Sequence, residues 1–592
     1  MLLSDRIRLD VGQALQELYS PAGGAVDFQI SLTKPEFEGD YTVVLFSLVK
    51  SLRKSPEDIA SSLGSLLMQK HPELYASYQL IKGFMNLTIA EPYLTGMLEK
   101  HYRDTCFGRA ALRHEKVMVE YSSPNTNKPL HLGHLRNNFL GWSIAEILKA
   151  NGYDVIKSCI VNDRGIHICK SMIAWQRFAD GATPASTGMK GDHFVGDYYV
   201  KFNDAYKQEV EELTASGMDK DKAEKEAPIM KATQEMLLQW EQGDPAVIDL
   251  WKRMNGWVYD GFDITYRKIG SNFDRIYYES ETYLLGKDAV DDGLQKGVFF
   301  RKADGSVWID LTDDGLDEKL LLRKDGTSVY ITQDIGLAKS KYEEYGIDQS
   351  IYVIGDEQNY HMKVLKLICK KLGLPYADGI HHLSYGMVEL PTGKMKSREG
   401  TVVDADDLVE EMISLSEKHT VELGKVQDIP AEDLVKLYGT IGLGALKFFL
   451  LRVDPKKKMI FNPEESIDFH GFTGPFIQYT YARIRSILRK QEPDPAWRLQ
   501  AGGLLPLEKK LLVELEQYGL VLRQAADGLD PSLLALYAYH LAKTFNSFYA
   551  EHSVAGAESE EKKQLRLRIC GMTSMVIASS LQLLGMQVPE RM

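Results

Sequence analysis

The order of strand-like and helix-like segments between residues 116 and 178 constrains the fold of this chain most strongly. KVMVEYSS has the apolar pattern of a strand, and LRNNFLGWSIAEILKANG follows it as an amphipathic helix closed by Gly152. YDVIKSCIVND is a second strand, and RGIHICKSMIAWQRF begins another helix. Strand, helix and strand in this order form a βαβ unit of an open parallel sheet. We therefore predict an α/β fold with a Rossmann-like parallel sheet.

The rest of the 592-residue chain divides into regions of different character, because this length exceeds a single hydrophobic core. The N-terminal region combines a helix that starts at Ser55 with the strand GFMNLTI, which predicts a small α+β domain. Strand–helix alternation returns at SVYITQDIG, and the sequence after GKMKSREG is almost wholly helical. We predict an α+β domain at 1–110, the Rossmann-like domain at 111–403 with an insertion at about 179–305, a helical connector at 404–474, and an all-α helical bundle at 475–592.

Composition narrows the cellular setting of the protein. The opening MLLSDRIRLDVGQALQELY turns charged and amphipathic at once, so we expect no secretory signal. We find no apolar stretch of the length that a bilayer requires, and we expect no membrane association. The five cysteines form no C-x-x-C pair, so we expect neither disulfides nor zinc, and a cytoplasmic location. The net charge of −13 argues against nonspecific binding to nucleic acid, and we expect no DNA partner.

The stretch SSPNTNKPLHLGHLRN places two histidines where the first helix of this unit begins. Free backbone N–H groups and the helix dipole at that end attract phosphate oxygens. His131 and His134 could donate hydrogen bonds to the charge that develops as pyrophosphate leaves. Gly133 leaves room for a flat purine, and Lys128 adds a positive charge for a polyphosphate. The alternative is a histidine-rich helix cap without a ligand, since short motifs have many false positives.

A second basic segment, TGKMKSREGT, follows the second half of the predicted sheet. Lys394 at its tip could reach a phosphate of a nucleotide when the loop closes. The alternative is a solvated surface loop, which is the usual state of basic loops. The two segments together are far more specific than either alone.

These two segments resemble the signature motifs of class I aminoacyl-tRNA synthetases, which read roughly His-Ile-Gly-His and Lys-Met-Ser-Lys-Ser. The surrounding sequence resembles the arginyl-tRNA synthetase family more narrowly, and the similarity covers essentially the whole chain. In our sequence Leu132 replaces isoleucine, and Ser397 stands at the second lysine position, with Lys396 one residue early. The resemblance rests on EYSSPNTNKPLHLGHLRN, IVNDRGIHI, FDRIYYESETY, DGTSVYITQDIG, YVIGDEQNYH, GFTGPFIQYTYARIRSILRK and the terminal PERM.

The resemblance implies a monomeric arginine–tRNA ligase that uses ATP with Mg²⁺, arginine and tRNA(Arg). Arginine would first be activated to arginyl-adenylate, with pyrophosphate released, and then transferred to the terminal adenosine of the tRNA. Family membership implies that tRNA is bound before activation proceeds. Lys128 is thought to supply the charge of the lysine missing from the second motif. The implied catalytic residues are His131, His134, Lys128 and Lys394, and the implied ATP-binding residues are His131, Gly133, His134, Lys394 and Ser397.

A pocket for arginine needs carboxylates and neutral acceptors, because a guanidinium is planar, permanently charged and carries five donors. Tyr330 and Asp334 are four residues apart and would share one helical face. Without the resemblance, Asp334 would be read as the N-cap of IGLAKSKYEEY, and Glu120 could be a solvated charge at a strand end. The predicted arginine-binding residues are Ser123, Asn125, His134, Tyr330, Asp334, Gln358 and Glu120.

The C-terminal stretch PFIQYTYARIRSILRK interleaves aromatic residues with arginines. Such residues can stack on unpaired bases and meet phosphates, although helices of a bundle normally carry similar stripes in their core. The resemblance implies that this bundle binds the anticodon, and we predict tRNA contacts for Tyr479 and Arg483. Asn86 matches a family position in the N-terminal domain that contacts the tRNA elbow.

Three other functions remain open from the sequence. Another class I synthetase is conceivable, although cysteine- and methionine-specific members usually carry zinc-ligand cysteines. A related nucleotidyl transferase would use only the histidine motif, and such enzymes are commonly far shorter. A catalytically silent tRNA-binding relative would be expected to have damaged motifs, whereas His131, His134, Gly133 and Lys394 are all present.

Overall fold

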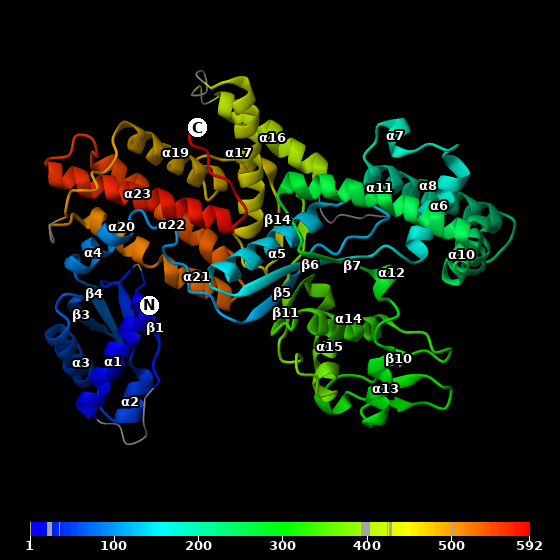
Figure 1. Cartoon of the computed structure of the whole chain (residues 1–592), viewed down its shortest axis with the longest axis horizontal. Helices are drawn as coiled ribbons and strands as arrows, with labels where there is room; N and C mark the ends of the chain where they lie inside the picture. Colours follow the sequence, from blue (N-terminus) through cyan, green and yellow to red (C-terminus); the bar gives the residue numbers. More distant parts are fainter. Residues whose placement is uncertain are drawn as a thin grey trace. The chain divides into compact units, whose positions relative to one another are not determined.

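A computed structural model describes the chain in two compact units. The first unit comprises Met1–Ala111, His419–Gly444 and Asp468–Met592, and the second comprises Leu112–Lys418 and Ala445–Ile467. Figure 1 shows the course of the chain through both units. The described residues are 2–19, 27–34, 36–391, 403–422, 424, 429–499 and 503–592.

A five-stranded parallel sheet forms the centre of the second unit, in the order β12-β11-β5-β6-β7. Counted from β7, the strands follow the 3-2-1-4-5 order of a Rossmann-like sheet, so the predicted fold class is confirmed. The order reverses between β5 and β11, and ligands of such sheets bind in the crevice at the carboxyl ends of the strands there. The strands are β5 (Lys116–Glu120), β6 (Asp154–Val161), β7 (Arg275–Tyr278), β11 (Gln349–Gly355) and β12 (Ile380–Tyr385).

Both faces of this sheet are covered by helices, as a parallel sheet requires. Val117, Met118 and Val119 of β5 are fully buried. Met118 packs in one apolar cluster with Leu337 of α14, whereas α5 lies on the opposite face (Figure 1). The covering helices are α5 (Leu132–Ala150), α14 (Tyr330–Tyr345) and α15 (Asn359–Lys371), with the 3-10 turn η2 (Asp356–Gln358) before α15. Helix α6 (Ile166–Phe178) follows β6 and packs with the helices of the insertion after it.

The insertion predicted at about 179–305 is in fact two insertions, because β7 lies inside that range and pairs with β6. A four-residue strand in a charged region gives too little alternation to be recognised from sequence. The first insertion is a bundle of α7 (Pro184–Thr187), α8 (Gly191–Ala215), α9 (Lys220–Glu226), α10 (Pro228–Gln242) and α11 (Pro245–Ile269). The second contains α12 (Glu279–Thr282), α13 (Lys287–Gln295), η1 (Thr312–Asp314) and an antiparallel sheet of β8 (Phe300–Arg301), β9 (Val307–Ile309) and β10 (Lys319–Leu322).

Helices α8 and α11 pack unusually closely where α8 begins. A Cβ atom at Gly191 would lie 1.9 Å from the carbonyl oxygen of Trp257 on α11. Only glycine permits this approach, so the start of α8 is fixed against α11.

Beyond the sheet, the second unit contains α16 (Ala405–Glu422) up to Lys418, α18 (Pro463–Ser466) and the short parallel pair β13 (Val388–Glu389) and β14 (Met459–Ile460). Helix α17 (Ala431–Leu451) is long and apolar enough to cross a membrane, contrary to our reading of the sequence. However, 67% of its most apolar 18-residue window is buried inside the protein. An apolar helix that is mostly covered by its own chain is typical of a protein core.

The first unit combines both ends of the chain. Its N-terminal part is an antiparallel sheet in the order β1-β2-β4-β3 with flanking helices, as predicted, and Ser55 caps α3 by accepting from the Asp58 N–H at 3.1 Å. Its elements are α1 (Leu3–Tyr19), β1 (Ile30–Leu32), β2 (Tyr41–Val44), α2 (Phe46–Leu52), α3 (Pro56–Lys70), β3 (Tyr75–Ile81), β4 (Phe84–Ile89), α4 (Glu91–His101), α19 (Gly474–Lys490), α20 (Pro506–Glu516), α21 (Tyr518–Asp527), α22 (Ser532–Glu551) and α23 (Glu560–Leu583).

The N-terminal sheet and the C-terminal helices, predicted as separate domains, belong to the same compact unit. The Arg523 guanidinium donates to both carboxylate oxygens of Asp5, at 2.6 and 2.7 Å. The buried Tyr41 of β2 donates its hydroxyl hydrogen to Glu516 of α20 at 2.5 Å. These contacts explain why the two ends of the chain pack as one body.

Candidate active site

The loop after β5 has a strained backbone at the carboxyl edge of the sheet. Ser122 and Ser123 have φ angles of 82° and 46°, which few residues other than glycine adopt. Asn137 of α5 holds the loop by accepting from the Ser122 N–H at 2.5 Å. The loop then continues beside β6 through a parallel bridge between Asn125 and Asn162. Strain of this kind persists where the surrounding structure enforces it, often at functional sites. Ser123 and Asn125 are therefore fixed beside the switch point of the sheet.

His131 and His134 cap the first turn of α5 with their own rings. Nδ1 of His131 accepts from the Gly133 N–H at 3.1 Å, and Nδ1 of His134 accepts from the His131 N–H at 3.1 Å. Because both Nδ1 atoms act as acceptors, each neutral ring carries its proton on Nε2. The two rings lie side by side, with their centroids 3.8 Å apart. The cap thus leaves two N–H donors available for a ligand.

Burial keeps both imidazoles neutral. Desolvation, with a smaller contribution from the charge on Lys128, lowers the pKa of His131 to about 4. Desolvation and the neighbouring His131 and Lys128 hold the pKa of His134 well below its ordinary value. Burial also lowers the pKa of Lys128. Near neutral pH the site therefore offers two neutral imidazole donors next to the half-buried amine of Lys128.

Gly133 serves the cap itself. A Cβ atom at this position would lie 3.0 Å from Cε1 of the His131 ring. Our prediction that Gly133 makes room for a purine therefore has a competing structural explanation, because the capping imidazole already needs this space.

The segment that follows the second motif is paired with the histidine motif. The Leu132 N–H donates to the Val403 carbonyl at 3.1 Å, and the Ala405 N–H donates to the Leu130 carbonyl at 3.0 Å. Asp404 thereby forms an antiparallel bridge with His131. Lys394, Lys396 and Ser397 lie outside the described residues, so their predicted roles stay predictions.

Three predicted arginine-binding residues come from the segment around β11, and each lies at or near the start or end of an element at the carboxyl edge of the parallel sheet. Tyr330 is the first residue of α14, Asp334 lies one turn further, and Gln358 ends η2 directly after β11. Because Val329 is the N-cap of α14, the alternative role of Asp334 as a helix cap is wrong. Nε2 of His361, in the first turn of α15, lies 2.6 Å from Oδ2 of Asp334. This contact shows that the starts of α14 and α15 converge.

Glu279 adds another carboxylate to this region. It is the first residue after β7, and burial together with the charges of Asp163 and Asp334 raises its pKa above the ordinary value. A half-buried carboxyl group close to another carboxylate is a favourable partner for a cationic ligand.

Glu120 does not fit its predicted role. Its carboxylate lies 2.5 Å from Nζ of Lys341, and both side chains are buried. Burial alone would lower the pKa of Lys341, but Glu120 and Tyr352 together raise it. The carboxylate of Glu120 is therefore paired with Lys341 inside the core, and we remove Glu120 from the proposed arginine pocket.

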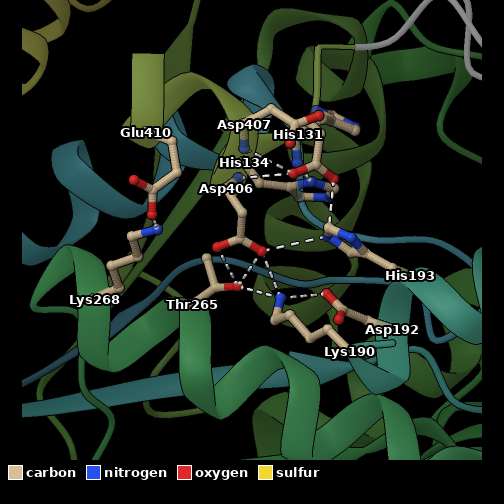
Figure 2. Close-up of polar contacts among 11 residues, drawn as sticks. His131, His134, Lys190, Asp192, His193, Thr265, Lys268, Asp406, Asp407 and Glu410 are labelled. Atoms are coloured by element: carbon tan, nitrogen blue, oxygen red, sulfur yellow. Dashed lines mark hydrogen bonds and ion pairs between the residues drawn. The ribbon is translucent and has the colours of Figure 1, made fainter. Parts of the chain in front are cut away.

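A second polar cluster adjoins the histidine motif (Figure 2). We call it the α8–α16 cluster, and it consists of Lys190, Asp192 and His193 at the start of α8, Thr265 of α11, and Asp404 and Asp406 at the start of α16. Nζ of Lys190 donates to Asp192 at 2.9 Å, to Thr265 at 2.6 Å and to Asp406 at 2.6 Å. Asp404 and Asp406 raise the pKa of His193 to about 10, so this imidazole is positively charged.

Asp192, His193 and Asp406 are also spaced closely enough to hold a metal ion. The ammonium of Lys190 already lies between the two carboxylates, where it supplies the positive charge that a cation would bring. These residues therefore do not form a suitable cation site.

The predicted tRNA-binding residues differ in accessibility. Asn86 is buried, accepts from the Thr42 hydroxyl at 2.7 Å and donates to the Glu38 carbonyl at 3.1 Å. Its amide is thus committed to holding the turn before β2, and the predicted contact with tRNA is not supported. Tyr479 and Arg483 are half-buried on one face of α19, with the guanidinium 4.9 Å from the centre of the Tyr479 ring.

Three residues that lie at or beside the site were not predicted from the sequence. Glu279 directly follows β7, and His361 lies three residues after η2, which itself follows β11. Ligands of open parallel sheets bind at the carboxyl ends of the strands, so both residues stand where a ligand contact is expected once β7 is recognised as a strand. His193 lies in the insertion, and no local pattern links it to a motif more than 50 residues away.

Comparison with known proteins is consistent along the whole chain. The family described as "tRNA synthetases class I (R), catalytic domain" matches residues 98–462. The "DALR anticodon binding domain" matches residues 477–592, and the "Arginyl tRNA synthetase N terminal domain" matches residues 5–89.

Individual proteins agree with these matches. The chain is 51% identical to an arginine–tRNA ligase of Bacteroides thetaiotaomicron, over 100% of both chains. It is 50% identical to an arginine–tRNA ligase of Amoebophilus asiaticus, over 99% of both. Among solved structures, the arginyl-tRNA synthetase of Thermus thermophilus superimposes with a TM-score of 0.81, at 26% identity and with 100% of both chains covered.

Proposed function

The chain belongs to the arginyl-tRNA synthetase family of class I ligases, and we propose how its residues divide the work of arginine–tRNA ligation. The protein is an arginine–tRNA ligase. It activates arginine with ATP, forming arginyl-adenylate and pyrophosphate, and then transfers arginine to the 3′-terminal adenosine of tRNA(Arg). The anticodon-binding family match at residues 477–592 assigns tRNA binding to the C-terminal helices.

The double histidine cap of α5 carries the catalytic proposal. The arginine carboxylate attacks the α-phosphate of ATP, and negative charge grows on the phosphate oxygens as pyrophosphate leaves. His131 and His134 each keep an Nε2–H donor that the helix cap does not use, and such preorganised donors stabilise charge that develops in a transition state. Lys128 adds a positive charge on the same side, and Lys394 is proposed to act from the second motif, with Ser397 beside the nucleotide. No protein nucleophile is required, so positioning and electrostatics supply the catalysis.

We propose that Asp334 and Glu279 receive the guanidinium of arginine, with Tyr330, Gln358, Asn125 and Ser123 completing the pocket. Two carboxylates suit a cation with five donors, and the contact between Asp334 and His361 holds one of them in place. His134, predicted as an arginine contact as well as a catalytic group, would border both substrates.

Mg²⁺ is expected to accompany ATP, and we assign it no protein ligand. Mg²⁺ usually keeps several waters and binds through substrate phosphates. The α8–α16 cluster does not suit it, because Lys190 occupies the position between the carboxylates. The ion would help to neutralise the phosphates of the bound nucleotide.

Substitution of Asp334→Asn tests the arginine pocket. The variant keeps the shape of the side chain but loses a charge that a guanidinium needs, so we expect KM for arginine to rise by about 10- to 100-fold. Aminoacylation measured against arginine concentration gives this value. An unchanged KM would remove Asp334 from the pocket.

ATP consumption with each amino acid, in the presence of total tRNA, tests the substrate assignment. We expect consumption with arginine and none above background with lysine or citrulline. ATP–pyrophosphate exchange is expected to require tRNA(Arg), and robust exchange in its absence would contradict the proposed order of binding.

Three further statements remain proposals. We propose that Tyr479 and Arg483 contact tRNA, since both are partly exposed on α19 within the anticodon-binding family match. We propose that the enzyme acts as a monomer. We also propose a cytoplasmic location, with which five free cysteine thiols are compatible.

A further inference from the structure

Asp404 contacts three parts of the second unit: the start of α16, the histidine motif and α8. Its Oδ1 accepts from the N–H groups of Asp406 at 2.8 Å and Asp407 at 3.2 Å, which caps α16. Its backbone forms the bridge with His131. Its Oδ2 lies 3.2 Å from Nε2 of His193 on α8. The capping residue of α16 is thus held by the first insertion while its backbone lies along the catalytic histidine.

His193 and His131 also face a common space. A cavity of about 290 Å³ opens between α8 and the histidine motif. His131, His193 and Asp404 all line it, together with Lys128. The two imidazoles therefore border the same cavity and are linked through Asp404.

The start of α8 is rigid enough to position another residue. Gly191 packs against the backbone of Trp257, and Lys190 connects α8 to Thr265 of α11 and to Asp406 of α16. Figure 2 shows the His193 ring directed from this helix toward the acidic start of α16. A charged imidazole held on a fixed helix can define where Asp404 lies.

Small displacements matter at this site, because catalytic donors must lie within about 0.5 Å of their productive positions. Residues Leu130 to Leu132 are held by backbone hydrogen bonds to the segment that contains Asp404. We propose that His193 is a positioning residue for arginine activation, which acts through Asp404 to place the His131 imidazole. This inference rests on the proposed role of His131.

Substitution of His193→Gln tests the inference, because glutamine keeps a polar side chain of similar size and removes the charge. We expect kcat for ATP–pyrophosphate exchange, measured with tRNA(Arg) present, to fall by about 10- to 100-fold. KM for arginine is expected to stay within about twofold, because the proposed arginine pocket lies on other elements. A merely structural defect would instead lower the fraction of active enzyme, which active-site titration measures.

Lys268→Gln is the matched control. Lys268 of α11 pairs with Glu410 of α16, so it also joins the first insertion to α16, but it does not contact Asp404. Figure 2 shows this pair apart from the His193 contacts. We expect kcat of Lys268→Gln to equal that of the unaltered enzyme. Equal losses in both variants, or a kcat of His193→Gln within twofold of normal, would overturn the inference.

Asp404→Asn provides a second route if His193→Gln folds poorly. Asparagine caps helices as well as aspartate does, so α16 should persist while the ion pair is lost. We expect a similar fall in kcat, and the double variant should be no slower than His193→Gln alone, because both substitutions remove the contact between His193 and Asp404. His193→Gln also removes the 3.4 Å approach of His193 to Asp406, which Asp404→Asn leaves in place. If the losses in kcat of the two single variants add in the double variant, His193 and Asp404 do not act through their common contact.

The His131→Asn variant separates this inference from the proposed function. We expect His131→Asn alone to lower kcat strongly and His193→Gln to add nothing to it. If His131→Asn is slow and His193→Gln still reduces its rate, His193 does not act through His131. If His131→Asn has normal activity, the proposed role of His131 fails instead.

Discussion

Single residues in this enzyme show different ways of keeping an ionisable group inside a fold. His131 is neutral and uses its ring as a helix cap. Lys341 is charged and paired with Glu120. Arg136 of α5, which is fully buried, donates to the carbonyl of Lys457 at 2.8 Å and that of Pro455 at 3.2 Å. In each case burial is compensated by a specific partner, as desolvation of a charge requires.

Removing one member of the Lys341–Glu120 pair should destabilise the second unit. Lys341→Met leaves the Glu120 carboxylate buried without a counter-charge, so we expect the free energy of unfolding to fall by about 3–5 kcal/mol. The double variant Glu120→Gln, Lys341→Met should recover most of this loss, because no unpaired charge remains. Urea unfolding followed by tryptophan fluorescence measures both. A single variant as stable as the double one would contradict the argument.

At the scale of elements, the starts of α14 and α15 are joined by a side-chain contact. His361 approaches Asp334 at 2.6 Å, although each residue belongs to a different helix. A helix start positions a side chain well only if a neighbour restrains its rotamer. We therefore expect His361 to act on the proposed arginine pocket through Asp334.

The His361→Asn variant should weaken arginine binding without abolishing the chemical step. Loss of the contact frees the Asp334 rotamer, so we expect KM for arginine to rise by about tenfold and kcat to change by less than about threefold. Steady-state aminoacylation gives both values. His381→Asn, at an exposed position on β12, serves as the control and should be unaffected.

Helix α20 carries two half-buried glutamates whose protonation affects stability. Burial raises the pKa of Glu514 and of Glu516 to about 7, above the ordinary 4.5. Between about pH 4.5 and 7 the unfolded chain loses these protons while the folded chain keeps them, so the free energy of unfolding falls as pH rises. The loss is complete above about pH 7.

Substitution of Glu514→Gln should flatten this pH dependence. We expect the midpoint temperature of unfolding to decrease less between pH 5 and pH 7.5 in the variant than in the unaltered enzyme, because one titrating group is removed. Calorimetry at several pH values measures this slope. Glu551→Gln, at an exposed position, should leave the slope unchanged.

Elements with strong periodicity could be predicted, whereas elements defined by long-range pairing could not. The stripe of α5 and the apolar run of β5 are local patterns, and both were located correctly. The four residues of β7 form a strand only because β6 lies beside them, and their position divided the predicted insertion. The partners of Glu120 and Asp404 could not be predicted either, because they lie on helices that are distant in the sequence. The histidine motif was recognisable because all its residues are adjacent in sequence.

At the scale of the whole molecule, the first unit joins the two ends of the chain. Asp5 pairs with Arg523, and Tyr41 bonds to Glu516, so the N-terminal sheet is packed against C-terminal helices rather than forming a separate body. A domain boundary drawn from composition alone cannot reveal such contacts.

Tyr41→Phe should loosen both parts of this unit together. The substitution leaves the half-buried Glu516 carboxyl without its hydroxyl donor, so we expect a loss of about 1–3 kcal/mol in the free energy of unfolding. Hydrogen exchange should accelerate in β2 and in α20 alike. Tyr549→Phe, which removes an exposed hydroxyl, provides the control. Acceleration confined to β2 would indicate that the two parts open independently.

The pairing of β5 with β11 has a consequence for biosynthesis. Lys116 at the start of β5 and Asp348 beside β11 are 232 residues apart in the chain, yet they share a hydrogen bond. A ribosome that adds about 5–20 residues per second needs roughly 12–46 seconds to span this separation. Throughout that time one edge of the nascent central strand lacks its neighbour, so the emerging polypeptide is most vulnerable to aggregation before the second half of the sheet is synthesised.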